Sequence, residues 1–486
     1  MNGHRITILG SHERELINWL TTHPLGHERG AIILFRRIAR RVKELPKSDR
    51  FISVEIIRME DDWIINSSNN QFTINMKKLP ELYHRCETEH LELGFVHNHP
   101  GEHLYFSKMD EINELNILHG LTGCNTPLSF LISLILSNNK WIGRIRQGVN
   151  PENILNVRHI SVLNEKLNLH GIQLAEEQPK SLLKQEIAFG KPFNIKLQSL
   201  RVAIVGLGGT GSPVANLLAR TGVGELILID GDFLEVTNMN RVSGFTKDDI
   251  GKNKAITVEK FIKSLGLNNN VIAIPEYINQ SEEALDALSS ADIIFGCTDD
   301  FAGRDVLNQA LYYYSQIYID VGLSGNVEKD QFGNTSLRTQ KGRVSCILPE
   351  YGSCLRCQNV INDQKILDEQ KIKDNPELAD LNPNILKKDF YIFGSDVPSP
   401  GIGAFTRGTA DNAVATLMNL ILDYRDLPSE LRQDNIWIDF IHMNIHSNYP
   451  KKNPDCIYCQ KHFLLNKDEG KYRLGTPQYG KIEVDV

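Results

Sequence analysis

The alternation of hydrophobic and polar positions divides the first part of the chain into short strands and helices. Apolar, β-branched runs at 51–57 and 91–97 are typical of strands. Residues 108–119 repeat apolar side chains at helical spacing. Residues 128–148 predict two strands joined by a polar turn. This pattern predicts an α+β domain.

From residue 201 onward the pattern changes to buried strands separated by helices. The apolar run 202–205 predicts a strand, and a glycine-rich loop follows it. A helix at about 212–221 and a strand at 225–229 come next, with further buried strands at 293–295 and 317–321. Strand, helix and strand in this order predict an α/β fold with a doubly wound, mostly parallel, Rossmann-like sheet.

The rest of the chain is less regular. Residues 150–195 are more polar, and we interpret them as a linker with lead-in helices. Beyond residue 340 come a cysteine-bearing segment, a charged stretch and a last helix near 413–422. The expected organisation is a first domain at 1–162, a linker at 163–195 and a nucleotide-binding domain at 196–486.

Composition limits the classes of protein that this chain can belong to. At 486 residues it is too long for one ordinary core, and 41% hydrophobic with 23% charged residues is usual for soluble proteins. A net charge of −7 argues against nucleic acid as the main partner. No segment predicts a membrane span or a secretory signal, so we expect a cytoplasmic protein. Eight cysteines are too few for a disulfide scaffold and, when paired in the cytosol, more often bind metal.

One segment of the first domain reads His-x-His-x7-Ser-x2-Asp, with His97, His99, Ser107 and Asp110. Two histidines and a carboxylate can hold zinc and leave its fourth position open for water, which is the pattern of a catalytic site. The Ser107 hydroxyl could donate to a developing oxyanion. The alternatives are a helix N-cap at Ser107 and ordinary loop histidines. The joint spacing favours a zinc hydrolase site.

On these residues, positions 1 to about 160 resemble a JAB/JAMM (MPN) metallopeptidase domain, the family of deubiquitinating isopeptidases. That family also uses a glutamate from an early helix, in a Glu-x-x-Gly-Leu-Leu type context. The run from Glu28 to Leu34 matches that context loosely. The resemblance therefore implies that Glu28 holds the zinc water and shuttles its proton. We interpret the nearby competitors Glu55, Glu92 and His103 as solvent-facing or strand residues.

The glycine loop of the second domain contains Gly206, Gly208, Gly209 and Gly211. Backbone amides of such a loop meet phosphate at the N-terminus of the following helix. Asp230, at the end of the next predicted strand, could bind ribose hydroxyls. This much also suits a dinucleotide dehydrogenase, so the loop alone leaves the reaction open.

Charged residues after the loop favour adenylation of a carboxylate over hydride transfer. A carboxylate and a triphosphate are both anionic, so cations must screen their approach and the leaving pyrophosphate. Arg241 and Lys254 suit that role. Asp299 suits Mg²⁺, which takes hard oxygen ligands and bridges phosphates. The alternative is a scatter of surface charges, against which their order and spacing argue.

With these motifs, residues from about 180 onward resemble the E1/ThiF/MoeB/HesA adenylyltransferase family. Its members activate the C-terminal glycine of a ubiquitin-like protein as an acyl-adenylate. The family pattern continues with Asp-x-Asp, Ser-Asn-Leu-x-Arg, Gly-x-x-Lys-Ala and Thr-Asp-Asn, and Asp300 replaces its last Asn. The positions implied for ATP and magnesium are Gly206, Gly208, Gly209, Gly211, Asp230, Asp232, Asn238, Arg241, Lys254, Asp299 and Asp300.

Two Cys-x-x-Cys pairs complete this resemblance. They are Cys354 with Cys357 and Cys456 with Cys459. Two such knuckles make a closed, structural four-thiolate zinc site. Unpaired cysteines would not be expected at this double spacing, and a redox role is a minor alternative because neither pair begins a helix after a strand.

Two departures from the family concern acyl transfer and dimerisation. Many relatives carry a thioester-forming cysteine after the first knuckle, but residues 395–406 contain none. Cys297 and Cys346 fall on predicted buried strands and are weak substitutes. Relatives often begin with Arg-x-x-Arg-Gln, whose arginine reaches the ATP of a partner subunit. Here Lys184 keeps the charge but not the bidentate fork.

Together the resemblances imply two enzymes fused to serve one ubiquitin-like protein, as in bacterial ubiquitin-like conjugation or sulfur-carrier operons, some linked to antiphage defence. The peptidase would trim the modifier or reverse its conjugation, and the second domain would adenylate it with ATP and Mg²⁺. An E2-like protein or a sulfur donor would accept the acyl group, and a homodimer through the second domain is expected. Sulfur-carrier activation for a cofactor pathway is one alternative. A modifier-binding scaffold with one or both sites silent is the other.

Overall fold

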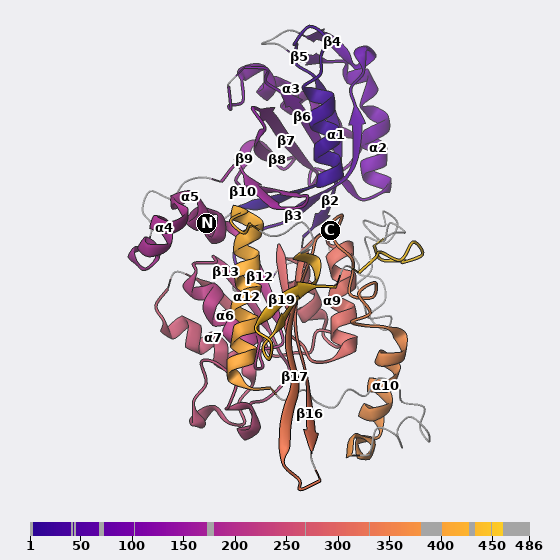
Figure 1. Ribbon diagram of the computed structural model, residues 1–486. Coiled ribbons are helices and arrows are strands. Elements are labelled where there is room, and N and C mark those ends of the chain that lie inside the picture. The colour runs from indigo at the N-terminus through magenta and orange to yellow at the C-terminus, as the bar shows by residue number, and fades with distance from the viewer. Residues whose placement is uncertain are drawn as a thin grey trace.

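The computed structural model describes residues 3–39, 42, 45–67, 72–101, 103–172, 179–267, 269–329, 331–380, 401–426, 433–448 and 450–459. Within these ranges the chain builds two units, each around its own sheet. Figure 1 shows the first unit, indigo to purple, above the second, magenta to yellow.

The first unit is a mixed nine-stranded sheet in the order β11-β10-β1-β3-β2-β6-β7-β8-β9. One helix packs on one face of the sheet and two on the other. The predicted strands and helix of this unit are present. Its elements are β1 (His4–Leu9), α1 (Gly10–Leu20), β2 (Gly30–Ile38), β3 (Arg50–Arg58), β4 (Ile64–Ser67), β5 (Phe72–Ile74), α2 (Pro80–Thr88), β6 (Leu91–Asn98), α3 (Lys108–Cys124), β7 (Phe130–Ser137), β8 (Lys140–Gln147), β9 (Asn150–Leu155), β10 (Val157–Leu163) and β11 (Leu167–His170).

Residues 150–170 form three strands, where the sequence analysis expected a linker. β10 is buried along its whole length between β1 and β11, whereas β9 is largely exposed at the sheet edge. The buried residues of β10 include Arg158, His159 and Ser161. Their polarity gave the stretch the composition of a linker. Arg158 and His159 instead face Glu225 and Asp292 of the second unit, and Ser161 donates to Ile6 O of β1. The expected lead-in helices do follow, at α4 (Leu183–Phe189) and α5 (Lys191–Ser199).

The second unit is an eight-stranded sheet in the order β14-β13-β12-β15-β16-β17-β18-β19. The first five strands run parallel and the last three antiparallel. Helices α6, α7 and α12 pack on one face and α8 and α9 on the other, which confirms the predicted doubly wound sheet. The elements are β12 (Arg201–Val205), α6 (Gly211–Arg220), β13 (Glu225–Ile229), α7 (Lys254–Ser264), β14 (Asn270–Ile274), α8 (Glu282–Ser289), β15 (Ile293–Gly296), α9 (Phe301–Tyr313), β16 (Ile317–Lys329), β17 (Thr335–Ile347), α10 (Asp363–Asp374), α12 (Gly403–Leu422), β18 (Ile436–Asp439) and β19 (Asn444–Ser447).

Buried arginines of the first unit join it to the second. Arg5 lies 2.9 Å from Asp292 and also donates to Ser290 O at the end of α8. Arg50 donates to carbonyls at the ends of α8 and α9. Because helix C-termini carry partial negative charge and unsatisfied carbonyls, arginines are the side chains that such an interface favours.

These contacts also decide which edge of the second sheet stays open. Asp292 precedes β15, and Glu225, which begins β13, accepts hydrogen bonds from Arg158 and Arg201. The first unit therefore covers the amino ends of the parallel strands. The carboxyl ends, where α/β sheets bind their ligands, face the opposite way.

None of the helices in the described ranges is long and apolar enough to cross a membrane.

Candidate functional sites

The end of β6 and the start of α3 bring His97, His99 and Asp110 together. His97 Nε2 lies 3.1 Å from His99 Nε2 and 3.1 Å from Asp110 Oδ1, and His99 Nε2 lies 3.7 Å from Asp110 Oδ2. Zinc bonds of about 2.0–2.1 Å in a tetrahedron place donor atoms about 3.4 Å apart. The three side chains therefore fit a zinc ion and leave one coordination position open.

A capping box fixes Asp110 in this position. The Ser107 hydroxyl accepts from the Asp110 N–H at 3.2 Å, and Asp110 Oδ2 accepts from the Ser107 N–H at 2.6 Å. Oδ1 is the oxygen that faces His97. Asp110 can therefore take part in the helix cap and bind a metal at the same time. The N-cap alternative considered for Ser107 does not exclude a metal site.

Hydrogen bonds also set the charge state and orientation of the cluster. His99 Nδ1 lies 3.0 Å from His103 O, and donation to that carbonyl leaves Nε2 free to bind a metal. Burial opposes ionisation of Asp110, but hydrogen bonds from His97 and His99 outweigh it and hold the pKa of Asp110 well below its ordinary value. The carboxylate is therefore ready to act as a ligand.

Glu28 lies in the connection before β2, not on a helix as the family pattern led us to expect. α1 already ends at Leu20, so the glutamate reaches the site from an extended segment. The neighbouring Arg29 N–H donates to Asn98 Oδ1 at 2.7 Å and fastens this segment to the end of β6. The pKa of Glu28 lies above its ordinary value. Burial is the main cause and the charge of Asp110 adds to it, whereas His97 and His99 act in the opposite direction. Its carboxyl group thus lies within the electrostatic field of the cluster.

The competing glutamates have other partners. Glu55 pairs with Arg85, at 2.9 Å. Glu92 accepts from the Phe130 N–H at 2.8 Å, and burial raises its pKa to about 7. Neither belongs to the three-donor cluster. These contacts support the interpretation of both as strand residues.

The glycine loop between β12 and α6 is compact at two of its glycines. Gly206 has a φ of +84°, and a Cβ there would lie 2.7 Å from Cys297 O. A Cβ at Gly211 would lie 1.8 Å from Gly206 O. At Gly208, in contrast, an added Cβ would meet no heavy atom within 4 Å. The loop is thus closed on the protein side and open beside Gly208, where its backbone amides can approach phosphate.

Asp230 holds the loop from the neighbouring strand. Its two carboxylate oxygens accept from the Leu207 N–H at 2.5 Å and the Asp232 N–H at 2.8 Å. Burial raises its pKa to about 6. Sequence reasoning assigned Asp230 to ribose, and the structure adds a backbone role beside that assignment.

Asp232 and Lys254 form an ion pair beside Asp230, with Lys254 Nζ 2.9 Å from Asp232 Oδ2. Tyr277, which the sequence analysis missed, donates its hydroxyl to Asp232 Oδ1 at 2.7 Å. The tyrosine ring packs against Gly231, where an added Cβ would lie 2.7 Å away. The only signal in the sequence is the place of Tyr277 just after β14, at the carboxyl edge of the sheet.

The remaining predicted residues surround the same edge. The Arg241 side chain lies against Gly209, where a Cβ would be 3.0 Å from it, and Arg241 Nη1 donates to Thr237 O at 2.7 Å. Asn238 Oδ1 accepts from the Glu235 N–H at 3.1 Å. The predicted nucleotide residues therefore meet at one end of the sheet.

Asp299 and Asp300 follow β15 and differ in their surroundings. Asp299 is exposed, whereas Asp300 caps α9 by accepting from the Gly303 N–H at 2.8 Å. Because Asn and Asp are equally good N-caps, the replacement of the family Asn leaves this function intact. Glu369 of α10, which the sequence analysis also missed, accepts from the first two amides of α9, those of Phe301 and Ala302, at 3.1 Å each.

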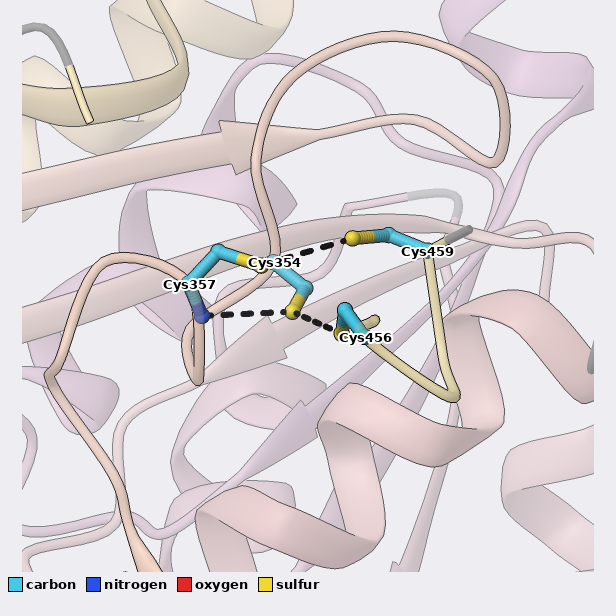
Figure 2. Close-up of side chains that lie close together, drawn as sticks. All are labelled: Cys354, Cys357, Cys456 and Cys459. Atoms are coloured by element: carbon cyan, nitrogen blue, oxygen red, sulfur yellow. Dashed lines mark hydrogen bonds between the residues drawn. The ribbon is translucent and has the colours of Figure 1, made fainter. Parts of the chain in front are cut away.

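The four knuckle cysteines gather into a second cluster, shown in Figure 2. Cys354 Sγ lies 3.6 Å from Cys456 Sγ, and Cys357 Sγ lies 3.5 Å from Cys459 Sγ. Zinc–sulfur bonds of about 2.3 Å in a tetrahedron place the sulfurs about 3.8 Å apart. The cluster therefore fits a zinc ion with all four positions filled by protein.

Comparison with known proteins identifies the second half. Residues 182–458 match the ThiF family, which is more than half of the chain. The chain belongs to the ThiF family. It is 28% identical over 205 residues to ubiquitin-like modifier-activating enzyme 5 of Dictyostelium discoideum, covering 40% of this chain and 50% of that protein. It is 31% identical over 163 residues to protein HesA of Leptolyngbya boryana, covering 33% of this chain and 57% of that protein. The chain thus spans about half the length of these relatives.

A solved structure of E. coli MccB with MccA-N7isoASN also matches. Its TM-score is 0.44 at 22% identity, over 59% of this chain and 76% of that chain. The ThiF match begins at residue 182 and takes in the glycine loop and the charged residues after it. It confirms the adenylyltransferase resemblance, while the JAMM resemblance of the first unit stays a prediction.

The other thiols of the ThiF unit are poor nucleophiles. Cys297 and Cys346 are buried, and burial raises the pKa of each to about 12. Of the segment 395–406 in which many relatives carry a thioester cysteine, residues 395–400 lie outside the described ranges. The start of α12 supplies the remainder. Lys184, at the position of the family arginine, lies in the first turn of α4 and is exposed.

Proposed function

We propose that the ThiF unit adenylates the carboxyl terminus of a ubiquitin-like protein. The observation that carries the proposal is the family match over the segment in which the glycine loop, Arg241, Lys254 and Asp299 meet at one sheet edge. A relative named as a modifier-activating enzyme supports the class of substrate.

The side chains divide the work by charge. Amides of the loop around Gly208 bind phosphate oxygens, and Arg241 beside Gly209 neutralises further charge. When the nucleotide binds, the Lys254 ammonium leaves its ion pair with Asp232 and binds a phosphate oxygen. A modifier carboxylate oxygen attacks the α-phosphorus, the bond to the β-phosphate breaks, and pyrophosphate leaves. Asp299, exposed beside the loop, would hold Mg²⁺, which supplies charge compensation for the pyrophosphate.

The acyl-adenylate then passes directly to an external acceptor. Buried Cys297 and Cys346 give no accessible thiolate to take it. An E2-like cysteine would make the protein part of a conjugation system, and a sulfur donor would make it a sulfur-carrier activator. Both share the adenylation step, so the identity of the acceptor separates them.

Modifier-dependent exchange of labelled pyrophosphate into ATP tests the adenylation step. We expect exchange only when a ubiquitin-like protein with a free terminal glycine is present, and loss of exchange in Asp299→Ala. Asp61→Ala is the matched control because Asp61 is an exposed carboxylate of the first unit. Exchange that survives in Asp299→Ala, or that ignores the modifier, would refute the assignment.

We also propose that the first unit is a zinc-dependent peptidase acting on the same modifier. The observation that favours this second activity is the three-donor cluster with Glu28 beside it. His97, His99 and Asp110 would hold a zinc ion, which would supply Lewis acidity and lower the pKa of a bound water. Glu28 accepts a proton and delivers it to the leaving amine, and the Ser107 hydroxyl donates to the oxyanion.

Cleavage of a modifier that carries a C-terminal extension tests the peptidase. We expect the extension to be removed after the terminal glycine. A zinc-selective chelator in the presence of excess Mg²⁺ should stop this cleavage while pyrophosphate exchange continues. A zinc-loaded protein that binds the modifier but cleaves neither extensions nor isopeptide conjugates would show that the first unit is a scaffold.

A further inference from the structure

The first proposed site lies far from the contact between the two units. At one end of β2, Arg36 donates to Tyr313 O of the ThiF unit at 3.3 Å. At the other end of β2, Gly30 pairs with His97 of the metal cluster. The six residue steps from Gly30 to Arg36 correspond to about 20 Å of strand.

The second proposed site lies far from the same contact, on its other side. Arg201, at the amino end of β12, donates to Pro46 O of the first unit at 3.1 Å. Gly206, just past the carboxyl end, begins the nucleotide loop, about 16 Å further along the strand. Figure 1 shows the hairpin of β16 and β17 extending in this carboxyl direction, away from the first unit.

The joint between the units is built of buried charge. Asp292 is 8% exposed and lies 2.9 Å from Arg5 and 3.7 Å from Arg50, both of which are almost completely buried. Glu225 is likewise buried between Arg158 and Arg201. Opening the joint would separate these charges from their partners, which is strongly unfavourable. The two sites are therefore held apart and cannot swing toward each other.

We infer that a trimmed modifier leaves the first site and reaches the adenylation site through solution. The inference rests on the proposed function of both units. A peptide extends at most about 3.3–3.6 Å per residue, so about ten fully extended residues would be needed even along a straight line through the molecule. Trimming releases a free carboxylate and an amine. That carboxylate attacks ATP only after a second, separate binding event.

It follows that one chain holds two modifiers at once, one at each site. The peptidase can then act on conjugates made by other copies of the enzyme, because its substrate need not come from its own adenylation site. The two units act on the same kind of modifier, but no bound intermediate passes directly from one unit to the other.

An isotope-dilution experiment tests this inference. Labelled modifier with a C-terminal extension is given to the full-length enzyme with ATP, together with increasing amounts of unlabelled modifier that already ends in glycine. We expect the labelled adenylate to fall in proportion to the labelled share of trimmed modifier, about tenfold at a tenfold excess. Labelled adenylate that resists the unlabelled pool would demonstrate direct transfer, within a chain or between subunits, and would overturn the inference.

A mixture of two variants provides an independent test of transfer through solution. Glu28→Gln lacks the peptidase base and Asp299→Ala lacks the adenylation carboxylate. We expect the mixture to adenylate the extended modifier after a lag, at a rate set by the free concentration of trimmed modifier. A mixture that forms no adenylate, although each variant retains its other activity, would also overturn the inference. If the wild-type enzyme neither trims nor adenylates, the proposed function itself is wrong and the inference falls with it.

Discussion

The two candidate metal clusters differ in how many donors they have and in how far apart those donors lie along the chain. His97, His99 and Asp110 come from one short segment and leave a coordination position open. The cysteine cluster takes two donors from each of two knuckles, and the sulfur pairs that meet are separated by 102 residues. The first cluster is local and incomplete, whereas the second is long-range and closed.

This difference assigns chemistry to one cluster and stability to the other. A metal that joins distant segments closes a long loop, so its binding energy contributes to folding. A metal held within one strand end and one helix start closes almost no loop. Its open position and the adjacent Glu28 are expected to serve the proposed cleavage reaction instead. Substitutions in the two clusters should therefore affect different measurements.

The largest effect is expected from Cys354→Ser. Cys354 is fully buried in the core of the ThiF unit, and its loss opens the four-sulfur cluster. We expect one zinc fewer per chain and a loss of stability on the order of 5 kcal/mol, since structural zinc contributes its binding energy to folding. Zinc analysis and thermal unfolding measure both. Cys124→Ser is the matched control, because Cys124 is exposed and belongs to neither cluster.

A Cys354→Ser protein that keeps its full zinc content and its unfolding temperature would contradict the comparison. It would mean that the cysteine cluster is not a metal site, or that three sulfurs hold the metal without cost to the fold.

The next largest effect is expected from Glu28→Gln, and only on the rate of cleavage. The amide keeps the shape of the side chain but cannot take a proton, so cleavage should fall about 10²–10⁴-fold. Zinc content and unfolding temperature should stay unchanged, because Glu28 is not one of the three donors. Glu60→Gln, at an exposed position of the same unit, is the control. Wild-type cleavage in Glu28→Gln would require a different base and would reopen Glu55 and Glu92.

The sequence predicted those parts of the sites that depend on neighbours in the chain. Alternation along a strand puts His97 and His99 on one side, and the N-cap preference of Ser107 puts Asp110 in the first turn of α3. The same holds for the glycine loop, which lies between a strand and a helix. The two cysteine knuckles were predicted to meet because their spacing has one common structural explanation.

Contacts between distant residues had no such signal. Arg5 and Asp292 are 287 positions apart, and nothing in the sequence tells which buried arginine pairs with which carboxylate. Residues of β10 were interpreted as a linker for the same reason, since the partners of Arg158 and His159 lie in the second unit. Tyr277 and Glu369 acquire their contacts only when segments distant in the chain meet, the loop after β14 with Asp232 and helix α10 with the start of α9.

Apart from the loss of the proposed oxyanion donor, which should slow cleavage, the smallest effect is expected from Ser107→Ala, and it sharpens the comparison most. The variant loses the side-chain half of the capping box, so stability should fall by about 1 kcal/mol. The control is Ser281→Ala, which removes an equivalent N-cap from α8 in the ThiF unit, where Ser281 accepts from the Ala284 N–H at 3.2 Å. Both variants should lose similar stability by thermal unfolding, since both lose one cap.

Only Ser107→Ala should also weaken zinc at the open cluster. The Ser107 hydroxyl accepts from the Asp110 N–H and so holds the backbone that carries this ligand, whereas the Ser107 N–H that orients the carboxylate remains in the variant. Zinc affinity should therefore fall about tenfold, the low end of the effect of an outer-shell hydrogen bond. Competition with a chromogenic chelator measures this, while the cysteine cluster keeps its zinc in both variants. If the two variants bound zinc equally well, the Ser107 hydroxyl would act as a helix cap without affecting zinc binding. The geometry of the cluster would then be set by β6 and the remaining contacts of α3.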